Sequence, residues 1–188
     1  MAVVSTMLPL GTAAPEFALP DTVSGRMLSL DQLASDRATV VMFLCNHCPY
    51  VVHVNEALVA LAQDYMPRGV AFVAISSNDV ERYPEDSPEQ MKRVAGELGY
   101  PFPYLYDESQ QVALAYQAAC TPDFYVFDGD RRLVYRGQFD DSRPANDTPV
   151  TGRDLRAALD AVLDGRDVDP EQTASIGCGI KWKHSAAM

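Results

Sequence analysis

The sequence predicts an α/β fold in which helices flank a central mixed β-sheet. Two continuous runs of apolar and β-branched residues, Thr39–Leu44 and Val70–Ser76, are typical of strands that are covered on both faces. A helical pattern follows each run, and the Asp-Gly turn at Asp128–Asp130 separates two further apolar segments, which indicates a hairpin. Strands that alternate with helices and end in a hairpin are typical of a mixed sheet.

The N-terminal segment predicts an irregular arm followed by a β-hairpin. Residues 1–16 show no regular pattern. Phe17–Pro20 and Met27–Leu30 read as two short strands, because the segment between them, Asp21–Gly25, is rich in turn-forming residues. A short helical turn is expected at Asp31–Ser35.

Two helices are predicted around the second buried strand. Between Pro49 and Tyr65 the apolar residues recur at helical spacing: Val51, Val54, Leu58, Leu61 and Ala62. The second helix starts at Ser87, which is followed by proline at the first helical position and by glutamine at the third. Gly99 and Pro101 end it.

The remaining elements are shorter. We expect a strand at Pro103–Tyr106, a helix at Ser109–Ala119, and the hairpin strands Phe124–Phe127 and Leu133–Phe139. A last helix, capped by Thr151, runs to about Leu163.

The length of 188 residues fits one domain, which we place at residues 1–165, with the N-terminal arm included. Residues 166–188 form a C-terminal tail. We expect the tail to pack on the domain, because it carries three large apolar side chains: Ile176, Ile180 and Trp182.

The charge balance of 15 Lys and Arg against 26 Asp and Glu gives a net charge of −11. Such a surface repels phosphate backbones and anionic lipids, so we expect neither nucleic acid nor membrane partners. No apolar run has the length of a membrane span. The first basic residue is Arg26, so no charged segment precedes the apolar stretch Val3–Leu10, and we expect a cytoplasmic protein. Four cysteines are too few for a disulfide-stapled scaffold.

Cys45 and Cys48 have the Cys-x-x-Cys spacing, with His47 between them, at the junction of a buried strand and a helix. The free N–H groups and the dipole of a helix N-terminus favour an anion, and the thiolate is the reactive form of cysteine. Pro49 prefers the first helical position, which makes Cys48 the N-cap and the expected nucleophile. The alternatives are two buried structural cysteines, or a zinc site, which needs about four ligands. No second close ligand pair is present, and we expect no metal.

Three segments in order resemble the thioredoxin superfamily, and within it the peroxiredoxin-like branch of alkyl hydroperoxide reductase and thiol-specific antioxidant proteins. They are Gly11–Pro20, Cys45–Pro49 and Thr121–Asp128. The resemblance implies a thioredoxin-like fold. It also implies that the Thr121–Pro122 bond is cis and faces the active cysteines, leaving backbone groups free to pair with a substrate.

The same alignment places Cys48 where thioredoxins carry their nucleophile and where peroxiredoxins carry their peroxidatic cysteine. Peroxiredoxins resemble Pro-x-x-x-Thr/Ser-x-x-Cys, whereas this chain has Val41 and Cys45 at the proline and hydroxyl positions. The residues that orient a peroxide are therefore absent. Met42 stands where many thioredoxins carry a buried carboxylate.

The resulting hypothesis is a thiol–disulfide oxidoreductase without a cofactor. Cys48 attacks a substrate disulfide, Cys45 resolves the mixed disulfide, and His47 tunes the Cys48 thiolate. The expected partner is a disulfide-containing protein or a small-molecule thiol substrate. The cellular reductant is open. Four residues are expected to contact the substrate: Pro49, Tyr50, Thr121 and Pro122. The alternatives are a thiol peroxidase that uses Cys48, and a non-catalytic binding module on the same fold.

Other candidate residues have plainer interpretations. Cys120 precedes Thr121, so it is either an extra thiol near the active cysteines or, as we expect, a buried structural cysteine. Cys178 is either a resolving thiol or an exposed one. His53 is expected to be an ordinary helix residue. The acidic segments Glu81–Glu89 and Asp140–Asp147 are expected to be solvated loops.

Overall fold

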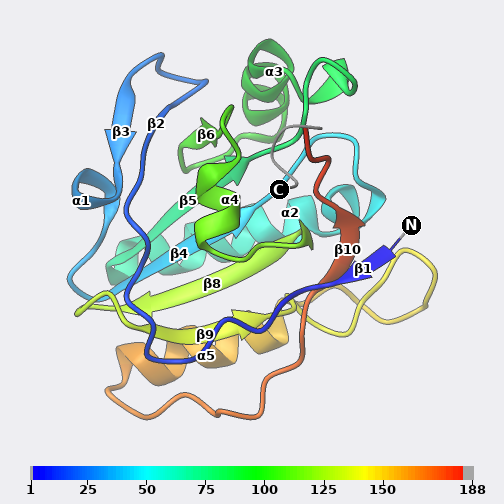
Figure 1. Ribbon diagram of the computed structural model, residues 1–188. Helices are drawn as coiled ribbons and strands as arrows, with labels where there is room; N and C mark the ends of the chain where they lie inside the picture. Colours follow the sequence, from blue (N-terminus) through cyan, green and yellow to red (C-terminus); the bar gives the residue numbers. More distant parts are fainter. Residues whose placement is uncertain (1, 184–188) are drawn as a thin grey trace.

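The computed structural model describes residues 2–183, and helices lie on both faces of its five-stranded mixed sheet (Figure 1). The strand order is β6-β5-β4-β8-β9, with the bounds Tyr104–Tyr106, Val70–Ser76, Ala38–Phe43, Asp123–Asp128 and Leu133–Gly137. β4 and β6 run parallel to β5, whereas β8 runs antiparallel to both β4 and β9. The predicted α/β class and the β8–β9 hairpin are confirmed.

The central strand β4 sorts its side chains between two cores, because successive residues of a strand point to opposite faces. Val40 and Met42 pack in one core with α2, α3 and α5, whose bounds are Pro49–Tyr65, Pro88–Leu98 and Arg153–Leu163. Val41 and Phe43 pack in the other core with the N-terminal segment and with α1 and α4, which span Leu30–Leu33 and Gln111–Ala115. All of β4 is buried, as its continuous apolar run predicts.

The helix ends follow from capping chemistry. α2 covers the predicted residues, with Cys48 as its N-cap and Pro49 in its first turn. Ser87 caps α3 by accepting a hydrogen bond from the backbone N–H of Gln90 at 3.4 Å, and Gly99 ends α3 with φ of 65°. A 3₁₀ helix at Met66–Arg68 follows α2, and another at Pro84–Asp86 precedes α3.

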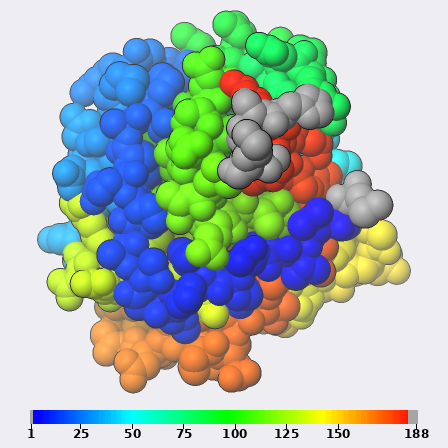
Figure 2. Space-filling view, viewed as in Figure 1, coloured from blue at the N-terminus to red at the C-terminus, as the bar shows by residue number. Residues whose placement is uncertain are grey.

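A second, three-stranded antiparallel sheet joins the two ends of the chain. Its order is β1-β10-β7, with the bounds Ala2–Val4, Ile176–Gly179 and Cys120–Thr121. The prediction of an irregular arm at residues 1–16 is therefore wrong for β1. Residues 176–183 pack on the domain, as their apolar side chains predict, and Figure 2 shows this red segment against the green and blue parts of the chain. Residues 184–188 of the predicted tail lie outside the described residues.

The predicted N-terminal hairpin is present as β2, Ala18–Pro20, and β3, Met27–Ser29. α4 is shorter than expected, because the left-handed residues Gln110 and Gln117, with φ of 63° and 52°, lie on either side of it. No helix of the described chain is long and apolar enough to cross a membrane.

Two predictions about the start of α5 are wrong. Thr151 is not its N-cap, and Asp140, which was expected in a solvated loop, is buried. Gly152 is the N-cap, with φ of 67°. Asp140 is 2% exposed, and one of its carboxylate oxygens accepts the backbone N–H groups of Thr151 and Gly152, each at 2.6 Å. This carboxylate thus satisfies backbone donors at the beginning of the helix.

Substitution of Gly152 by alanine should destabilise the protein because there is no space for a side chain. A Cβ atom there would lie 2.7 Å from the Phe139 ring and 2.8 Å from Leu61. Gly165 has the same φ of 67°, but a Cβ atom there would meet no other atom within 4 Å, so Gly165→Ala is the matched control. We expect Gly152→Ala to lower the free energy of unfolding in urea by about 1–3 kcal/mol more than Gly165→Ala. Equal losses would contradict the steric explanation.

Candidate redox site

The two cysteines of the Cys-x-x-Cys segment lie where β4 passes into α2. Cys48 has the extended backbone of an N-cap, with φ of −71° and ψ of 121°, and Pro49 follows it in the first turn. Pro49 lacks an N–H group, so its place at the helix start leaves no donor unsatisfied. Both cysteines are free and buried, with exposed fractions of 2% for Cys45 and 0% for Cys48.

Thr121 contacts both thiols. The Cys48 thiol donates a hydrogen bond to the Thr121 carbonyl oxygen at 3.2 Å, and Sγ of Cys45 lies 3.2 Å from Oγ1 of Thr121. The Thr121–Pro122 peptide bond is cis, as the resemblance to the thioredoxin superfamily implied. The cis turn thus lies directly against the two thiols.

The pKa values of the two thiols are displaced in opposite directions. A hydrogen bond from the Cys45 thiol is the largest cause that lowers the pKa of Cys48, and it outweighs the effect of burial. The thiol of Cys178 and the backbone N–H groups of Val51 and Cys178 lower the pKa of Cys48 further, to about 5. The pKa of Cys45 is raised far above its usual range, because Cys45 donates to Cys48, is buried and faces the negative charge of Asp86. With these shifts Cys48 ionises below neutral pH while Cys45 keeps its proton, and the hydrogen bond from Cys48 to the Thr121 carbonyl oxygen belongs to the protonated form of Cys48.

His47 lies on the Cys45 side of the site. Its Nδ1 is 2.7 Å from Oδ2 of Asp86, without the alignment of a hydrogen bond, and its ring stacks on Tyr83 with the ring centroids 5.5 Å apart. The groups found to lower the pKa of Cys48 are thiols and backbone N–H groups. The predicted tuning of Cys48 by His47 therefore stays a prediction.

Asp86 is a site residue that the sequence did not reveal. It was expected in a solvated acidic loop, yet it is 0% exposed. Its carboxylate accepts the backbone N–H of Asn46 at 2.8 Å and Nδ2 of Asn78 at 2.7 Å, and so holds the loop between the two cysteines. Met42 is also buried, and the carboxylate that holds the loop between the cysteines comes from the segment before α3.

The same side chains could also hold a metal ion. Sγ of Cys45, a ring nitrogen of His47 and a carboxylate oxygen of Asp86 all lie within 4.8 Å of one another. A structural zinc site has four protein ligands, one more than this cluster of three supplies.

The backbone edge of β7 at Thr121 is covered by strand β10 of the same chain. β10 pairs with β7 so that Cys178 stands opposite Thr121 and Gly179 opposite Cys120. The prediction that this turn leaves its backbone free for a substrate is therefore wrong. Cys120 is fully buried, as expected, and its burial raises its pKa, whereas Cys178 is half-buried.

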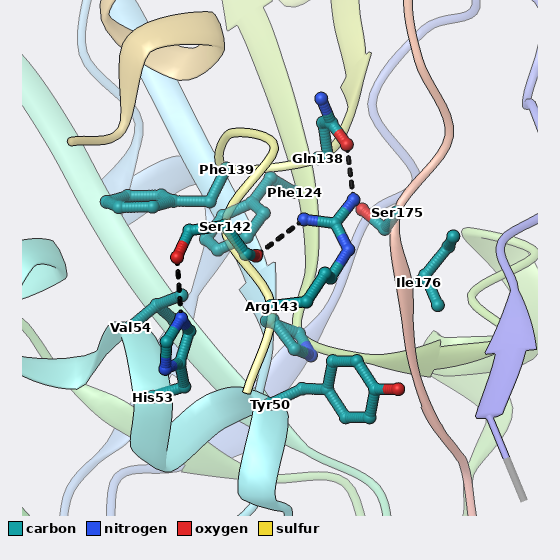
Figure 3. Close-up of a pocket in the computed structure, with 11 residues that line it drawn as sticks. Tyr50, His53, Val54, Phe124, Gln138, Phe139, Ser142, Arg143, Ser175 and Ile176 are labelled. Atoms are coloured by element: carbon teal, nitrogen blue, oxygen red, sulfur yellow. Dashed lines mark hydrogen bonds between the residues drawn. The ribbon is translucent and has the colours of Figure 1, made fainter. Parts of the chain in front are cut away.

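Two of the four predicted substrate-contact residues, Tyr50 and Pro122, line a pocket beside the cis turn (Figure 3), whereas Pro49 and Thr121 are not part of its lining. Tyr50 lies at its edge, opposite Ile176 of β10, and Pro122 forms part of its wall. His53 of α2 hydrogen-bonds with Oγ of Ser142 at 2.7 Å, which fits its interpretation as an ordinary helix residue. Arg143 also lines the pocket, and its guanidinium donates to the carbonyl oxygens of Asp140 and Ser142 at 2.6 and 2.7 Å.

The comparisons with known proteins agree with this geometry. The family described as AhpC/TSA matches residues 10–136. The chain belongs to the AhpC/TSA family. A search of curated proteins gives no match.

Solved structures show the same relationship for this AhpC/TSA family member. An uncharacterized conserved protein from Geobacillus kaustophilus is 65% identical with a TM-score of 0.97, over 98% of this chain and 97% of its own. A hypothetical protein from Sinorhizobium meliloti is 51% identical with a TM-score of 0.94, over 96% and 98% of the two chains. The peroxidoxin BcpB from Mycobacterium tuberculosis is 20% identical with a TM-score of 0.62, over 85% and 98%.

Thiol:disulfide interchange proteins from Chlorobium tepidum share the fold at similarly low identity. The chain is therefore a thioredoxin-fold member of a redox family, in its peroxiredoxin-like branch. The fold class and the family that the sequence motifs indicated are confirmed.

Replacing Asp86 by alanine should destabilise the protein, because Asn46 and Asn78 would lose their buried acceptor. We expect a loss of about 1–3 kcal/mol in the free energy of unfolding. Glu85 is the matched control, because its side chain is 49% exposed and Glu85→Ala should change the stability by less than about 0.5 kcal/mol. Urea unfolding of the two variants measures the difference, and similar values would contradict the role of Asp86.

The Cys48 thiolate should be visible in a pH titration. We expect the ultraviolet absorbance of one thiolate to be present at neutral pH and to disappear as the pH falls through about 5. Cys48→Ser should abolish this transition, and Cys120→Ser should leave it unchanged, because burial raises the pKa of Cys120. A midpoint near the ordinary value for cysteine would refute the assignment.

Proposed function

We propose that the protein is a thiol–disulfide oxidoreductase in which Cys48 is the nucleophile. The observation that carries the proposal is the position of Cys48 as the N-cap of α2, where Thr121 contacts both Cys45 and Cys48 and where Cys45 is the largest cause of the lowered pKa of Cys48. Thiolates attack disulfides, whereas thiols do not. The family and the fold support a redox role of this general kind.

In the first step the Cys48 thiolate attacks one sulfur of a substrate disulfide. A Cys48–substrate bond forms, the substrate S–S bond breaks, and the second substrate sulfur leaves as a thiolate. The leaving sulfur takes the electron pair of the broken bond, so the substrate is half reduced. The substrate is a disulfide-containing protein or a small disulfide, and the step needs no cofactor.

In the second step Cys45 attacks the mixed disulfide at Cys48 and releases the substrate as a thiol. Cys45 must first lose its proton, and its burial and the nearby Asp86 carboxylate both oppose this. A ring nitrogen of His47 and the Asp86 carboxylate are within 4.8 Å of the Cys45 sulfur, so this titratable pair is near enough to take up the proton. The role of His47 in this mechanism is to take up that proton, beside the tuning of Cys48 expected from the sequence.

Substrate access involves the surface around Tyr50 and Pro122. Cys48 is 0% exposed and β10 pairs along Thr121, so a chain that uses this edge has to displace β10. The pocket of Figure 3 lies beside the same turn and is lined by Tyr50, Pro122 and Ile176. We place the contacts with the substrate there.

A thiol peroxidase is the second candidate, and membership of the AhpC/TSA family favours it. In that reaction the Cys48 thiolate attacks a peroxide oxygen, which leaves Cys48 as sulfenic acid and releases water or an alcohol after protonation. A peroxide is small enough to reach a buried thiolate more readily than a protein disulfide. Turnover of hydrogen peroxide with a thiol reductant separates the two reactions, and turnover of peroxide without disulfide exchange would favour the peroxidase.

Removal of the Cys48 sulfur should abolish disulfide exchange. We expect Cys48→Ser to lower the rate of disulfide reduction by about 10³-fold or more, because no other group replaces a lost nucleophile. Cys120→Ser, which removes a buried thiol outside the exchange steps, should keep the rate. Limiting iodoacetamide at pH 6 followed by peptide mapping should label Cys48 before Cys45. Full activity of Cys48→Ser would instead indicate a non-catalytic binding module.

A further inference from the structure

β10 carries a third thiol to the place where the two active-site thiols meet. It lies between β1 and β7, with Cys178 opposite Thr121 in the antiparallel register. The carbonyl oxygen of the same Thr121 lies 3.2 Å from Sγ of Cys48. Cys48 and Cys178 therefore lie against the same residue, although 130 positions of the sequence separate them.

Cys178 influences the ionisation of Cys48 from this position. Its thiol and its backbone N–H are among the groups that lower the pKa of Cys48. Burial and the nearness of Cys48 raise the pKa of Cys178 to about 11. Cys178 packs against the core cluster that contains Cys45 and Cys48.

The glycines next to Cys178 allow this close approach. A Cβ atom at Gly177 would lie 1.9 Å from the carbonyl oxygen of Thr121, and one at Gly179 would lie 3.1 Å from Cγ2 of Val3. Real Cβ atoms essentially never lie less than 3.0 Å from another heavy atom, so a side chain at Gly177 would force the backbone of β10 or of Thr121 to shift. Gly177 is therefore required for β10 to lie this near to Thr121.

We propose that Cys178 is a second resolving thiol for Cys48, held in place by β10. The proposal rests on the proposed function. In this step the Cys178 thiol gives up its proton and attacks the Cys48 sulfur of a mixed disulfide. The Cys48–Cys178 bond forms, the bond from Cys48 to the substrate breaks, and the substrate sulfur leaves with the electron pair and takes up a proton. Cys48 and Cys178 are oxidised by two electrons in total, and the substrate disulfide is reduced by two.

Cys178 is better suited than Cys45 to lose a proton and attack the mixed disulfide. Cys45 is 2% exposed and faces the Asp86 carboxylate, which raises its pKa further. Cys178 is half-buried, and the positive charge of Lys181 lowers its pKa against the effects of burial and of Cys48. Its deprotonation is therefore less unfavourable than that of Cys45. Cys48 has one resolving thiol on each side, in the loop before α2 and in β10.

Variants of the two partner thiols separate this role from that of Cys45. The full-length protein is reduced and then mixed with less than one equivalent of 5,5′-dithiobis(2-nitrobenzoate), whose coloured thiolate reports each exchange step. In Cys45→Ser we expect a second coloured thiolate to be released, and mass spectrometry should find the Cys48–Cys178 disulfide. In Cys45→Ser/Cys178→Ser the mixed disulfide at Cys48 should persist, and Cys45→Ser/Cys120→Ser should behave as Cys45→Ser.

The outcomes are distinct. A mixed disulfide at Cys48 that persists equally in Cys45→Ser and in the double variant would overturn the role of Cys178 and leave the proposed function intact. No adduct at Cys48 in any protein, including the wild type, would overturn the proposed function and this inference with it.

A glycine substitution tests the contribution of β10. In the Cys45→Ser background, Gly177→Ala should slow formation of the Cys48–Cys178 disulfide by about 10²-fold, the loss expected from a misplacement of about 1 Å. Gly96→Ala is the matched control, because no atom lies within 4 Å of its Cβ position and its backbone has no positive φ. An unchanged rate in Gly177→Ala would show that β10 does not position Cys178.

Discussion

The contacts of Thr121 with the thiols are the constraint on which the rest of the site depends. Its carbonyl oxygen and its hydroxyl group each lie 3.2 Å from a sulfur, that of Cys48 and that of Cys45. Its backbone also pairs with Cys178. One residue thus fixes three thiols that come from the end of β4, the start of α2 and the C-terminal segment. A site in which the sulfurs share one anchor keeps its geometry only while β7, β10 and the β4–α2 junction remain packed together.

The stabilisation of the Cys48 thiolate comes from neutral donors. The thiols of Cys45 and Cys178 and the backbone N–H groups of Val51 and Cys178 lower its pKa against the penalty of burial. Such hydrogen bonds gain strength in a buried, low-dielectric site, where an unpaired anion would be costly. They also stabilise the reduced protein relative to a disulfide at Cys48, because the disulfide has no thiolate to accept them. The reactivity of the nucleophile and the redox poise of the pair therefore have the same physical origin.

The sequence predicted the parts of the fold and the site that depend on local chemistry. The buried strands β4 and β5 follow from continuous apolar runs, and the start of α2 follows from Pro49, which makes Cys48 the N-cap. The family motifs added the cis bond before Pro122. In each case the signal lies within a few adjacent residues, so periodicity, capping or a short motif is enough to find it.

The missed features depend on contacts between distant segments. β1, β7 and β10 have two to four residues each, too few for a periodic pattern, and their pairing joins the two ends of the chain. Asp86 belongs to a run of acidic residues, and only the donors of Asn46 and Asn78 distinguish it from exposed neighbours such as Glu85. Gly177 is one reason why the sequence did not predict a strand at β10. A strand interior normally disfavours glycine, but here the absence of a side chain is what lets the strand reach Thr121. The residue that weakens the strand signal in the sequence is thus the one that brings Cys178 to Cys48.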